Sequence, residues 1–351
     1  MADTVVITGV SRHLGGAFAR RLSGDRSVRR IIGVDIVPPR HGIGRAEFIR
    51  ADIRSPLIGR IIDDHAVDTV VHMSVIATPS AGGGRASQKE INVIGTMQLL
   101  AACQKAPSVK ALVVKSTAAV YGSSPKDPAM FAEDMGARRM PRTGWGRDSV
   151  EVEGYVRGFS RRRPDVAISM LRFANVIGPK IRTAFTDHFS LSVIPLPFGF
   201  DARLQFIHED DVPDALAIAV AKPGQGVVNV AGDGIITASQ AANLAGRPYV
   251  LIPRFIAGSV TGSLQRVGLV DVNPDQLDML SFGRGLDTTL MREQMGFTPR
   301  YTTRAAFEDF AREIPARPLH RALPFAQPGW AAVQAAQDAI GASAPVDPRE
   351  Q

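Results

Sequence analysis

The sequence predicts an α/β protein in which a doubly wound parallel sheet is combined with a smaller C-terminal lobe. Short apolar runs rich in Val and Ile, without strict alternation, are typical of strands buried on both faces of a parallel sheet. Amphipathic stretches separate these runs, with apolar residues at helical spacing such as Leu14, Phe18 and Leu22. Alternation of strand and helix in this manner indicates the α/β class.

The expected elements follow the chain in order. The strands are Thr4–Thr8, Arg30–Val37, Glu47–Ile53, Asp68–Met73, Ala111–Ser116, Ala167–Arg172 and Gly226–Ala231. Further helices are expected at Ile235–Arg247, Pro253–Val267, Thr302–Arg312 and, in a short form, Trp330–Ile340. Pro195 and Pro197 lie among large apolar residues between Pro179 and Leu204, which predicts an irregular lid or insertion there.

Composition excludes several classes of protein. With 351 residues, 45% of them hydrophobic and 21% charged, the chain is neither disordered, collagenous nor a coiled coil. Cys103 is the single cysteine, which excludes an intramolecular disulfide and a cysteine-based zinc site and favours the cytoplasm. No apolar run approaches the roughly 18 residues of a membrane span. The histidines show no metal-ligand spacing, so we expect no metal site.

Charge leaves a choice open. The formal net charge of +7 suits nucleic acid, a membrane surface or an anionic small molecule. The sequence is poor in aromatic residues and contains no recognised nucleic-acid reader motif, so nucleic acid is the least favoured partner. The basic run Arg161–Arg163 is interpreted as a solvated helix C-terminus, where the helix dipole favours cations.

A glycine-containing turn follows the first expected strand and opens the first helix. Gly9 and Gly15 take the first and third glycine positions of a dinucleotide fingerprint, while Arg12 replaces the middle glycine. Backbone N–H groups at such a turn bind a pyrophosphate on the helix N-terminus, here around His13 and Leu14. Arg12 either contacts that pyrophosphate or fills part of its place. A turn of the same shape that binds nothing is the alternative interpretation.

Two carboxylates end the second and third expected strands. Asp35 lies where a carboxylate binds both ribose hydroxyls and repels a 2′-phosphate, which favours NAD over NADP. Asp52, followed by Ile53, is placed to reach the adenine end of the cofactor.

These features, with several other motifs, resemble the extended short-chain dehydrogenase/reductase family, specifically nucleotide-sugar epimerases and dehydratases of the UDP-glucose 4-epimerase type. The motifs are Thr8–Gly15, Asp35, Asp52, Val71–Ser74, Asn92–Thr96, Ser116–Gly122, Leu171–Pro179 and Phe206–Val212. They run in the family's order over roughly residues 4 to 310, and the composition is similar to that of the actinobacterial branch.

The resemblance implies a domain organisation. Residues 1–178 would form an NAD-binding Rossmann core to which residues 205–232 return. Residues 179–204 and 233–314 would form the lobe that binds a nucleotide-diphosphate sugar, and residues 315–351 a tail with a short helix. Family members are often dimers, so a homodimer is expected by analogy only.

The resemblance also assigns roles to individual residues. Met73 and Ser74 would line the cofactor, Asn92 would support a helix and a proton relay, and Thr117 would supply a hydroxyl donor beside the substrate. For the substrate itself the candidates are Asn175, Arg284 and Arg203, the last standing one position from the usual arginine.

One part of the family pattern is absent. The family's chemistry uses a tyrosine and a lysine four residues later, but Trp145 and Ser149 stand at these positions, and the chain contains no Tyr-x-x-x-Lys. An indole N–H and a serine hydroxyl cannot replace an acidified phenol and a fixed positive charge. Asp148, His72 and Lys115 are possible substitutes, although we expect His72 and Lys115 to be structural.

Three functions therefore remain open from the sequence. The first is an NAD-dependent epimerase or dehydratase with an altered acid–base apparatus. The second is a non-catalytic sensor or scaffold that binds NAD or a nucleotide sugar. The third, and most distant, is a nucleic-acid binder.

Overall fold

A seven-stranded parallel sheet forms the centre of the computed structural model, which describes residues 2–74, 84–142, 144–253 and 274–313. The strand order is β11-β6-β5-β4-β1-β2-β3. In chain order the strands are β1 (Thr4–Thr8), β2 (Arg30–Asp35), β3 (Glu47–Arg50), β4 (Thr69–His72), β5 (Ala111–Thr117), β6 (Ala167–Phe173) and β11 (Gly226–Val230). The order reverses at β1, so the predicted doubly wound sheet is confirmed.

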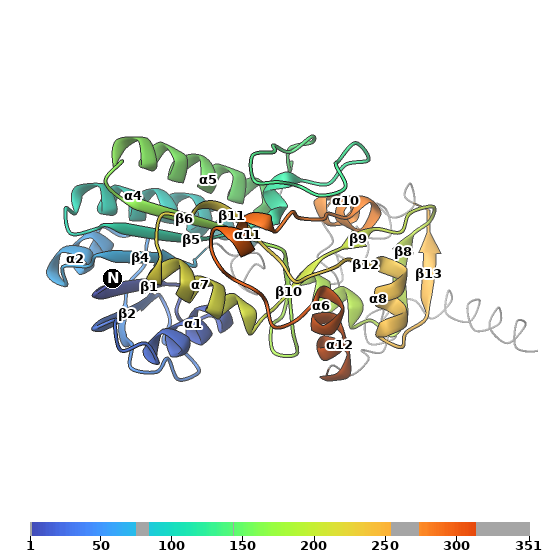
Figure 1. Ribbon diagram of the computed structural model, residues 1–351, viewed down its shortest axis with the longest axis horizontal. Helices are drawn as coiled ribbons and strands as arrows, with labels where there is room; N and C mark the ends of the chain where they lie inside the picture. The colour runs from blue at the N-terminus through green and yellow to red at the C-terminus, as the bar shows by residue number, and fades with distance from the viewer. Residues whose placement is uncertain (1, 75–83, 143, 254–273, 314–351) are drawn as a thin grey trace, which may run out of the picture.

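Helices cover both faces of this sheet (Figure 1). One layer contains α2 (Leu57–Asp64), α4 (Gly95–Lys105) and α5 (Gly144–Arg162), and the other contains α1 (His13–Ser23) and α7 (Asp211–Ala221). The five strands that cross the middle of the sheet are almost entirely buried, which explains their continuous Val and Ile runs. Phe18 and Leu216 belong to the apolar core on the α1 side, and Leu99 and Phe159 to that on the α5 side.

A second body of structure lies beyond the carboxyl end of the sheet. It comprises β7 (Asn175–Ile177), α6 (Ala184–Phe189), β8 (Ile194–Pro197), β9 (Arg203–Leu204), β10 (Phe206–His208), β12 (Ile236–Thr237), α8 (Ala238–Leu244), β13 (Tyr249–Ile252), α10 (Pro274–Phe282) and α12 (Thr303–Glu313), whereas α11 (Thr289–Glu293) packs against β11 of the sheet. Much of it shares a separate apolar cluster built on Phe189, Phe206, Phe307 and Phe310. This cluster supports the predicted lobe, and the exact domain boundaries stay a prediction.

Several expected boundaries are corrected. β2 ends at Asp35, because Ile36 and Val37 are exposed and Pro38 follows. β3 ends at Arg50, before the turn that begins after Asp52.

Two longer segments also differ from expectation. The expected helix at 235–247 begins only at Ala238, because Thr237 forms a capping box with Gln240 and the preceding residues pair as β12. The segment expected to be irregular at 179–204 contains α6 and β8, and the two prolines lie in β8, which pairs with β13 alone. The Thr302–Arg312 helix is confirmed as α12. Most of the expected Pro253–Val267 helix and the whole of Trp330–Ile340 lie outside the described residues.

Three connecting segments complete the sheet domain. A π-helix (Glu90–Ile94) joins α3 (Gly84–Lys89) to α4, and a 3₁₀ turn, η2 (Ala118–Tyr121), follows β5. Arg163, directly after α5, donates to the carbonyl oxygens of Cys103, Ala106 and Val109. Arg163 therefore links α5 to the loop after α4, whereas the sequence suggested only a solvated cation.

No helix in the described part of the chain has the length and apolar character needed to cross a membrane.

Candidate functional site

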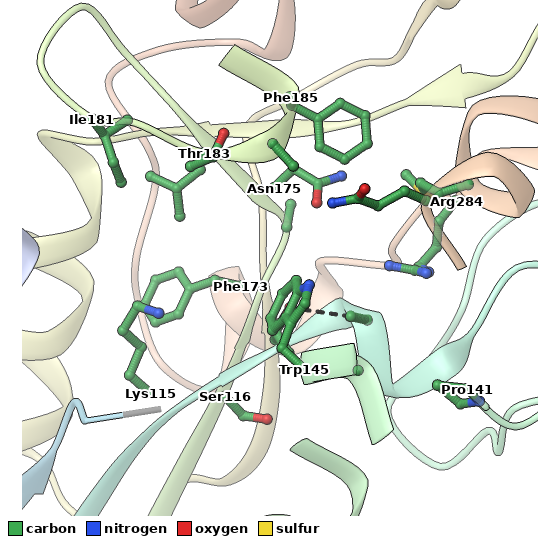
Figure 2. A pocket seen from close by; sticks show the side chains of 18 of the residues that line it. Lys115, Ser116, Pro141, Trp145, Phe173, Asn175, Ile181, Thr183, Phe185 and Arg284 are labelled. Atoms are coloured by element: carbon green, nitrogen blue, oxygen red, sulfur yellow. Dashed lines mark hydrogen bonds between the residues drawn. The ribbon is translucent and has the colours of Figure 1, made fainter. Parts of the chain in front are cut away.

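A pocket of about 480 Å³ opens where the carboxyl ends of the strands meet the lobe. This volume is in the range of small-molecule sites. Its walls come from the β1–α1 turn, the end of β5, the start of α5, the β6–β7 connection, α6 and α10 (Figure 2). In an open α/β sheet, this edge is where ligands bind.

The turn after β1 brings a helix N-terminus to the pocket. Gly9 has a φ of +76°, and a Cβ there would lie 3.2 Å from the Met73 carbonyl group. A Cβ on Gly15 would lie 2.1 Å from the Gly9 carbonyl oxygen, so only glycine permits this approach of α1 to the turn. Arg12 is the N-cap residue and makes no side-chain cap, and the first turn of α1 contains no acidic residue. The helix therefore presents uncapped N–H groups, which are suited to an anion.

The charged side chains around the pocket are strongly unbalanced. Arg12, Lys115, Arg139, Lys180, Arg182 and Arg284 line it, whereas Asp278 is the one carboxylate among its described lining residues. Asp278 is itself 3.3 Å from Arg139. The pocket is therefore electropositive, and part of the chain's net positive charge is concentrated at one cavity.

Strand β5 places alternate side chains on opposite sides of the sheet. Ser116 donates to Glu153 of α5 across 2.7 Å, and Figure 2 shows it directed away from the Lys115 ammonium group. Lys115 and Phe173 both line the pocket. Burial, followed by the nearby charge of Arg12, lowers the pKa of Lys115 to about 8. The expectation that Lys115 is only structural does not account for its place in the pocket wall.

Thr117 ends β5 and also lines the pocket. Its hydroxyl oxygen accepts the Ala119 N–H at 3.1 Å, which caps η2. Because a hydroxyl has one proton to donate, this arrangement leaves that proton for a ligand.

Helix α5 brings Trp145 into the centre of the pocket wall (Figure 2). Ser149, one turn later, is buried and does not line the pocket; its hydroxyl donates to the Trp145 carbonyl at 2.8 Å. Asn92 is fully buried in the π-helix and donates to Asp148 of α5 at 3.1 Å. Asn92 thus holds the beginning of α5 without lining the pocket.

The three candidate substrate residues differ in their relation to the pocket. Asn175, at the start of β7, directs its amide into the pocket (Figure 2). Arg284 also lines the pocket, but its guanidinium donates to the Gly122 carbonyl at 2.8 Å and to the Ser123 hydroxyl at 3.1 Å. Arg203 does not line it; the Arg203 carbonyl accepts the Arg284 N–H at 2.9 Å. Contact of either arginine with a substrate stays a prediction.

The outer cofactor candidates lie away from the pocket itself. The Asp35 carboxylate accepts the N–H groups of Ser11 and Ile36 at 3.1 and 2.8 Å, which fixes it beside the β1–α1 turn. Both oxygens of Asp52 accept from Arg54, and this hydrogen bonding lowers the pKa of Asp52. Ile53 is buried and packs closely against the start of α4, since a Cβ on Gly95 would lie 2.6 Å from the Ile53 side chain.

His13 has a partner that the sequence did not suggest. Its Nε2 lies 2.9 Å from Glu209, a buried carboxylate that follows β10 and also accepts the Lys180 N–H at 2.8 Å. Gly178 permits this, since a Cβ there would lie 2.5 Å from Glu209. His13 thereby joins the first turn of α1 to the β10–α7 connection, and Glu209 in turn holds the β7–α6 connection through Lys180.

The pocket thus brings together most of the inner candidates. Arg12, His13, Leu14, Gly15, Met73, Thr117, Trp145, Asn175 and Arg284 all line it. Gly9 and Ser74 lie directly behind, since a Cβ on Gly9 would be 3.2 Å from the Ser74 hydroxyl. Sequence reasoning missed Arg139, Lys180 and Arg182 and undervalued Lys115. The sequence did contain a signal for Lys115. Side chains two residues apart on a strand point to the same face, so Lys115 shares a face of β5 with the site candidate Thr117. Among the described residues, no group of side chains could hold a metal ion.

Comparison with known proteins identifies the family. The family model "NAD dependent epimerase/dehydratase family" matches residues 5–231. An uncharacterized protein of Mycobacterium tuberculosis is 45% identical over 312 residues, which is 88% of this chain and 83% of that protein. A probable UDP-arabinose 4-epimerase of Oryza sativa subsp. japonica is 28% identical over 136 residues, which is 38% of this chain and 32% of that protein.

Solved structures show the same fold. MoeE5 in complex with UDP-glucuronic acid and NAD matches with a TM-score of 0.67 at 22% identity, covering 89% of this chain and 98% of that one. The UDP-glucose 4-epimerase of Thermotoga maritima with UDP-glucose has a TM-score of 0.67 at 19% identity, covering 88% and 98%.

Proposed function

The chain belongs to the NAD-dependent epimerase/dehydratase family, and from this premise we propose that its pocket binds NAD together with a nucleotide-diphosphate sugar. The observation that carries the proposal is the charge of the pocket. Lysine and arginine side chains dominate its wall, and the uncapped N-terminus of α1 opens into it. Two diphosphate groups are ligands that such a wall suits.

The residues present fit NAD. The first turn of α1 would bind the pyrophosphate, because Gly9 and Gly15 allow the backbone a close approach and the turn contains no acidic residue of its own. Asp35, fixed by two backbone N–H groups, retains lone pairs for the ribose hydroxyls. When bound, NAD supplies two-electron oxidation and reduction of an alcohol carbon. Arg12 would lie near the middle of the dinucleotide, since its charge acts on both Asp35 and Lys115.

For the sugar, the chain offers two hydrogen-bond donors in the same pocket. Thr117 donates its free hydroxyl proton and Asn175 its amide, and these two groups orient a sugar hydroxyl. Trp145 provides an apolar face against which a sugar or a nicotinamide ring packs. Trp145 and Ser149 take no part in proton transfer, because an indole N–H is not acidic and the Ser149 hydroxyl is engaged within α5.

Calorimetric titration tests this proposal. We expect binding of NAD in preference to NADP, and binding of UDP-sugars that is tighter when NAD is present. Titration against UDP, glucose and UDP-glucose separately shows whether the diphosphate and the sugar both contribute. Absence of binding by both NAD and every nucleotide sugar contradicts the proposal. Salt-sensitive DNA binding without stabilisation by NAD would favour the distant nucleic-acid function instead.

One observation favours a second candidate, a non-catalytic sensor or scaffold. Neither Trp145 nor Ser149 on α5 supplies a titratable side chain to the pocket. A protein of this kind would show NAD-dependent thermal stabilisation and no turnover across a panel of nucleotide sugars. Formation of reduced nicotinamide with any of these sugars would exclude it.

A further inference from the structure

In contrast to the exposed Lys180 of the same wall, Lys115 is a half-buried basic side chain of the pocket. No hydrogen bond or ion pair joins its Nζ to any residue in the described ranges 2–74, 84–142, 144–253 and 274–313. By contrast, Arg139 is paired with Asp278, Arg182 with Asp187, and Arg284 with the Gly122 carbonyl. A lysine held in a cavity without such a partner is a candidate for chemistry.

The surroundings of Lys115 disfavour its protonated form. Arg12 approaches from the β1–α1 turn, and His72 lies on the adjacent strand β4 within range of the Lys115 charge. The other charged groups facing the cavity are His13, Arg139, Lys180, Arg182, Asp278 and Arg284. Phe173, from the neighbouring strand β6, contributes an apolar side chain to the same pocket wall. A lysine that is partly removed from water and lies near other cations loses its proton more readily than one in water.

The position of Lys115 also matches the task that Trp145 and Ser149 cannot perform. Lys115 and Thr117 lie two residues apart on β5, so both project from the same side of the strand, and both line the pocket with Trp145 and Asn175. A sugar hydroxyl oriented by Thr117 and Asn175 would therefore lie in the same cavity as the Lys115 amine.

We propose that Lys115 is the proton acceptor and donor of this pocket, in place of the tyrosine of the family resemblance. The proposal rests on the proposed function, since it takes a nucleotide-linked sugar as the substrate class and the oxidised nicotinamide dinucleotide as the oxidant. In the forward direction the hydroxyl O–H bond breaks and its proton forms a new N–H bond at Nζ. The alcohol carbon becomes a carbonyl, and its hydrogen leaves with two electrons to the dinucleotide, which is reduced. Reversal of both transfers regenerates an alcohol and the neutral amine.

Selective labelling of amines gives a readout that does not depend on turnover. The protein is labelled with acetic anhydride across a pH series, and mass spectrometry follows Lys115 and, in the same sample, the exposed Lys110 at the other end of β5. We expect half-maximal reactivity of Lys115 near pH 8, in line with its pKa of about 8. Addition of NAD is expected to protect Lys115 and to leave Lys110 unchanged. Labelling of Lys115 only at the pH where Lys110 reacts would overturn the proposal.

Two variants separate proton transfer from anion binding. Lys115→Met removes the amine and keeps an unbranched stem, whereas Lys115→Arg keeps the charge but cannot release a proton. We expect both to lower formation of reduced nicotinamide by about 10²–10⁴-fold, while Lys115→Arg still binds NAD and UDP-glucose by calorimetry. A Lys115→Arg protein as active as the wild type would show that Lys115 only binds anions.

The two proposals fail in different ways. If the wild-type protein binds NAD and nucleotide sugars but never forms reduced nicotinamide, the proton-transfer role of Lys115 is wrong and the binding function stands. If it binds neither ligand, the proposed function itself is wrong.

Discussion

The Ser149 hydroxyl donates a hydrogen bond to the Trp145 carbonyl, 2.8 Å away within α5. These are the two positions at which the family resemblance places a tyrosine and a lysine. One side chain lines the pocket without an acidic group, and the other is satisfied inside its own helix. Neither position therefore offers an acidic or basic side chain to the pocket.

Restoration of the pair is the first prediction. In a Lys115→Met background, which lacks the proposed proton acceptor, Trp145→Tyr/Ser149→Lys is expected to oxidise nucleotide sugars with NAD about 10²-fold faster than Trp145→Phe/Ser149→Lys, which carries the same lysine but no phenol. The absorbance of reduced nicotinamide provides the measurement. Equal rates in the two variants, with NAD affinity retained, would show that the start of α5 no longer has the geometry for this chemistry.

Cofactor selectivity depends on Asp35. Because its carboxylate is fixed by the N–H groups of Ser11 and Ile36, Asp35→Asn is expected to weaken NAD binding about 10-fold or more and to narrow the preference over NADP. Asp52→Asn is the matched control, since Asp52 is already held by Arg54. Calorimetry with both dinucleotides decides. A larger loss with Asp52→Asn than with Asp35→Asn would reverse the assignment of the ribose-binding residue.

A buried ion pair joins α5 to the sheet beneath the pocket. Arg172 of β6 lies 2.7 Å from Glu153, and both side chains are less than a tenth exposed. Arg172→Met leaves the buried Glu153 carboxylate with only Ser116 and Arg157 as partners, so we expect a loss of about 3 kcal/mol in the free energy of unfolding, the low end for a broken buried pair.

The double variant Arg172→Met/Glu153→Leu tests the same pair further. It is expected to be less destabilised than the sum of its single changes. Arg304→Met, which removes an exposed pair with Glu308, serves as the surface control and is expected to cost at most about 0.5 kcal/mol. Urea unfolding measures the wild type and the four variants, and additive single changes would contradict an interaction between Arg172 and Glu153.

Acid sensitivity follows from His72. Its two ring nitrogens are each 2.9 Å from a threonine hydroxyl, those of Thr8 and Thr96. Burial, and then the Lys115 charge, lowers the pKa of His72 to about 4. Since an unfolded histidine titrates near pH 6.5, the unfolded chain binds more protons between pH 4 and 6.5. Stability is therefore lost as the pH falls through this window, by up to about 1.4 kcal/mol per pH unit for this histidine.

Denaturation with urea at several pH values checks this prediction. His72→Gln is expected to be less stable at pH 7 but to lose less stability on acidification than the wild type. Burial lowers the pKa of His188 to about 4 as well, so part of the acid sensitivity is expected to remain. An identical pH slope in the variant would show that His72 does not contribute.

The α/β class, the strand sequence and the glycine turn could be predicted from the sequence because each depends on local pattern. Buried parallel strands need continuous apolar residues, and the turn after β1 needs glycine where φ is positive. Boundaries were less predictable. The end of β2 at Asp35 depends on its pairing with β3. The division of residues 235–247 into β12 and α8 depends on the pairing of β12 with β9 and on the capping box at Thr237.

The sequence alone determined that the tyrosine and lysine pair is missing, since this depends only on which residues the chain contains. Only the tertiary structure placed Lys115, Arg139 and Arg182 around one cavity and revealed the Glu209 partner of His13. These residues are far apart along the chain, and their charges act on one another through space. A basic composition therefore became an electropositive pocket only when the strands, α5 and the lobe were assembled around the same edge of the sheet.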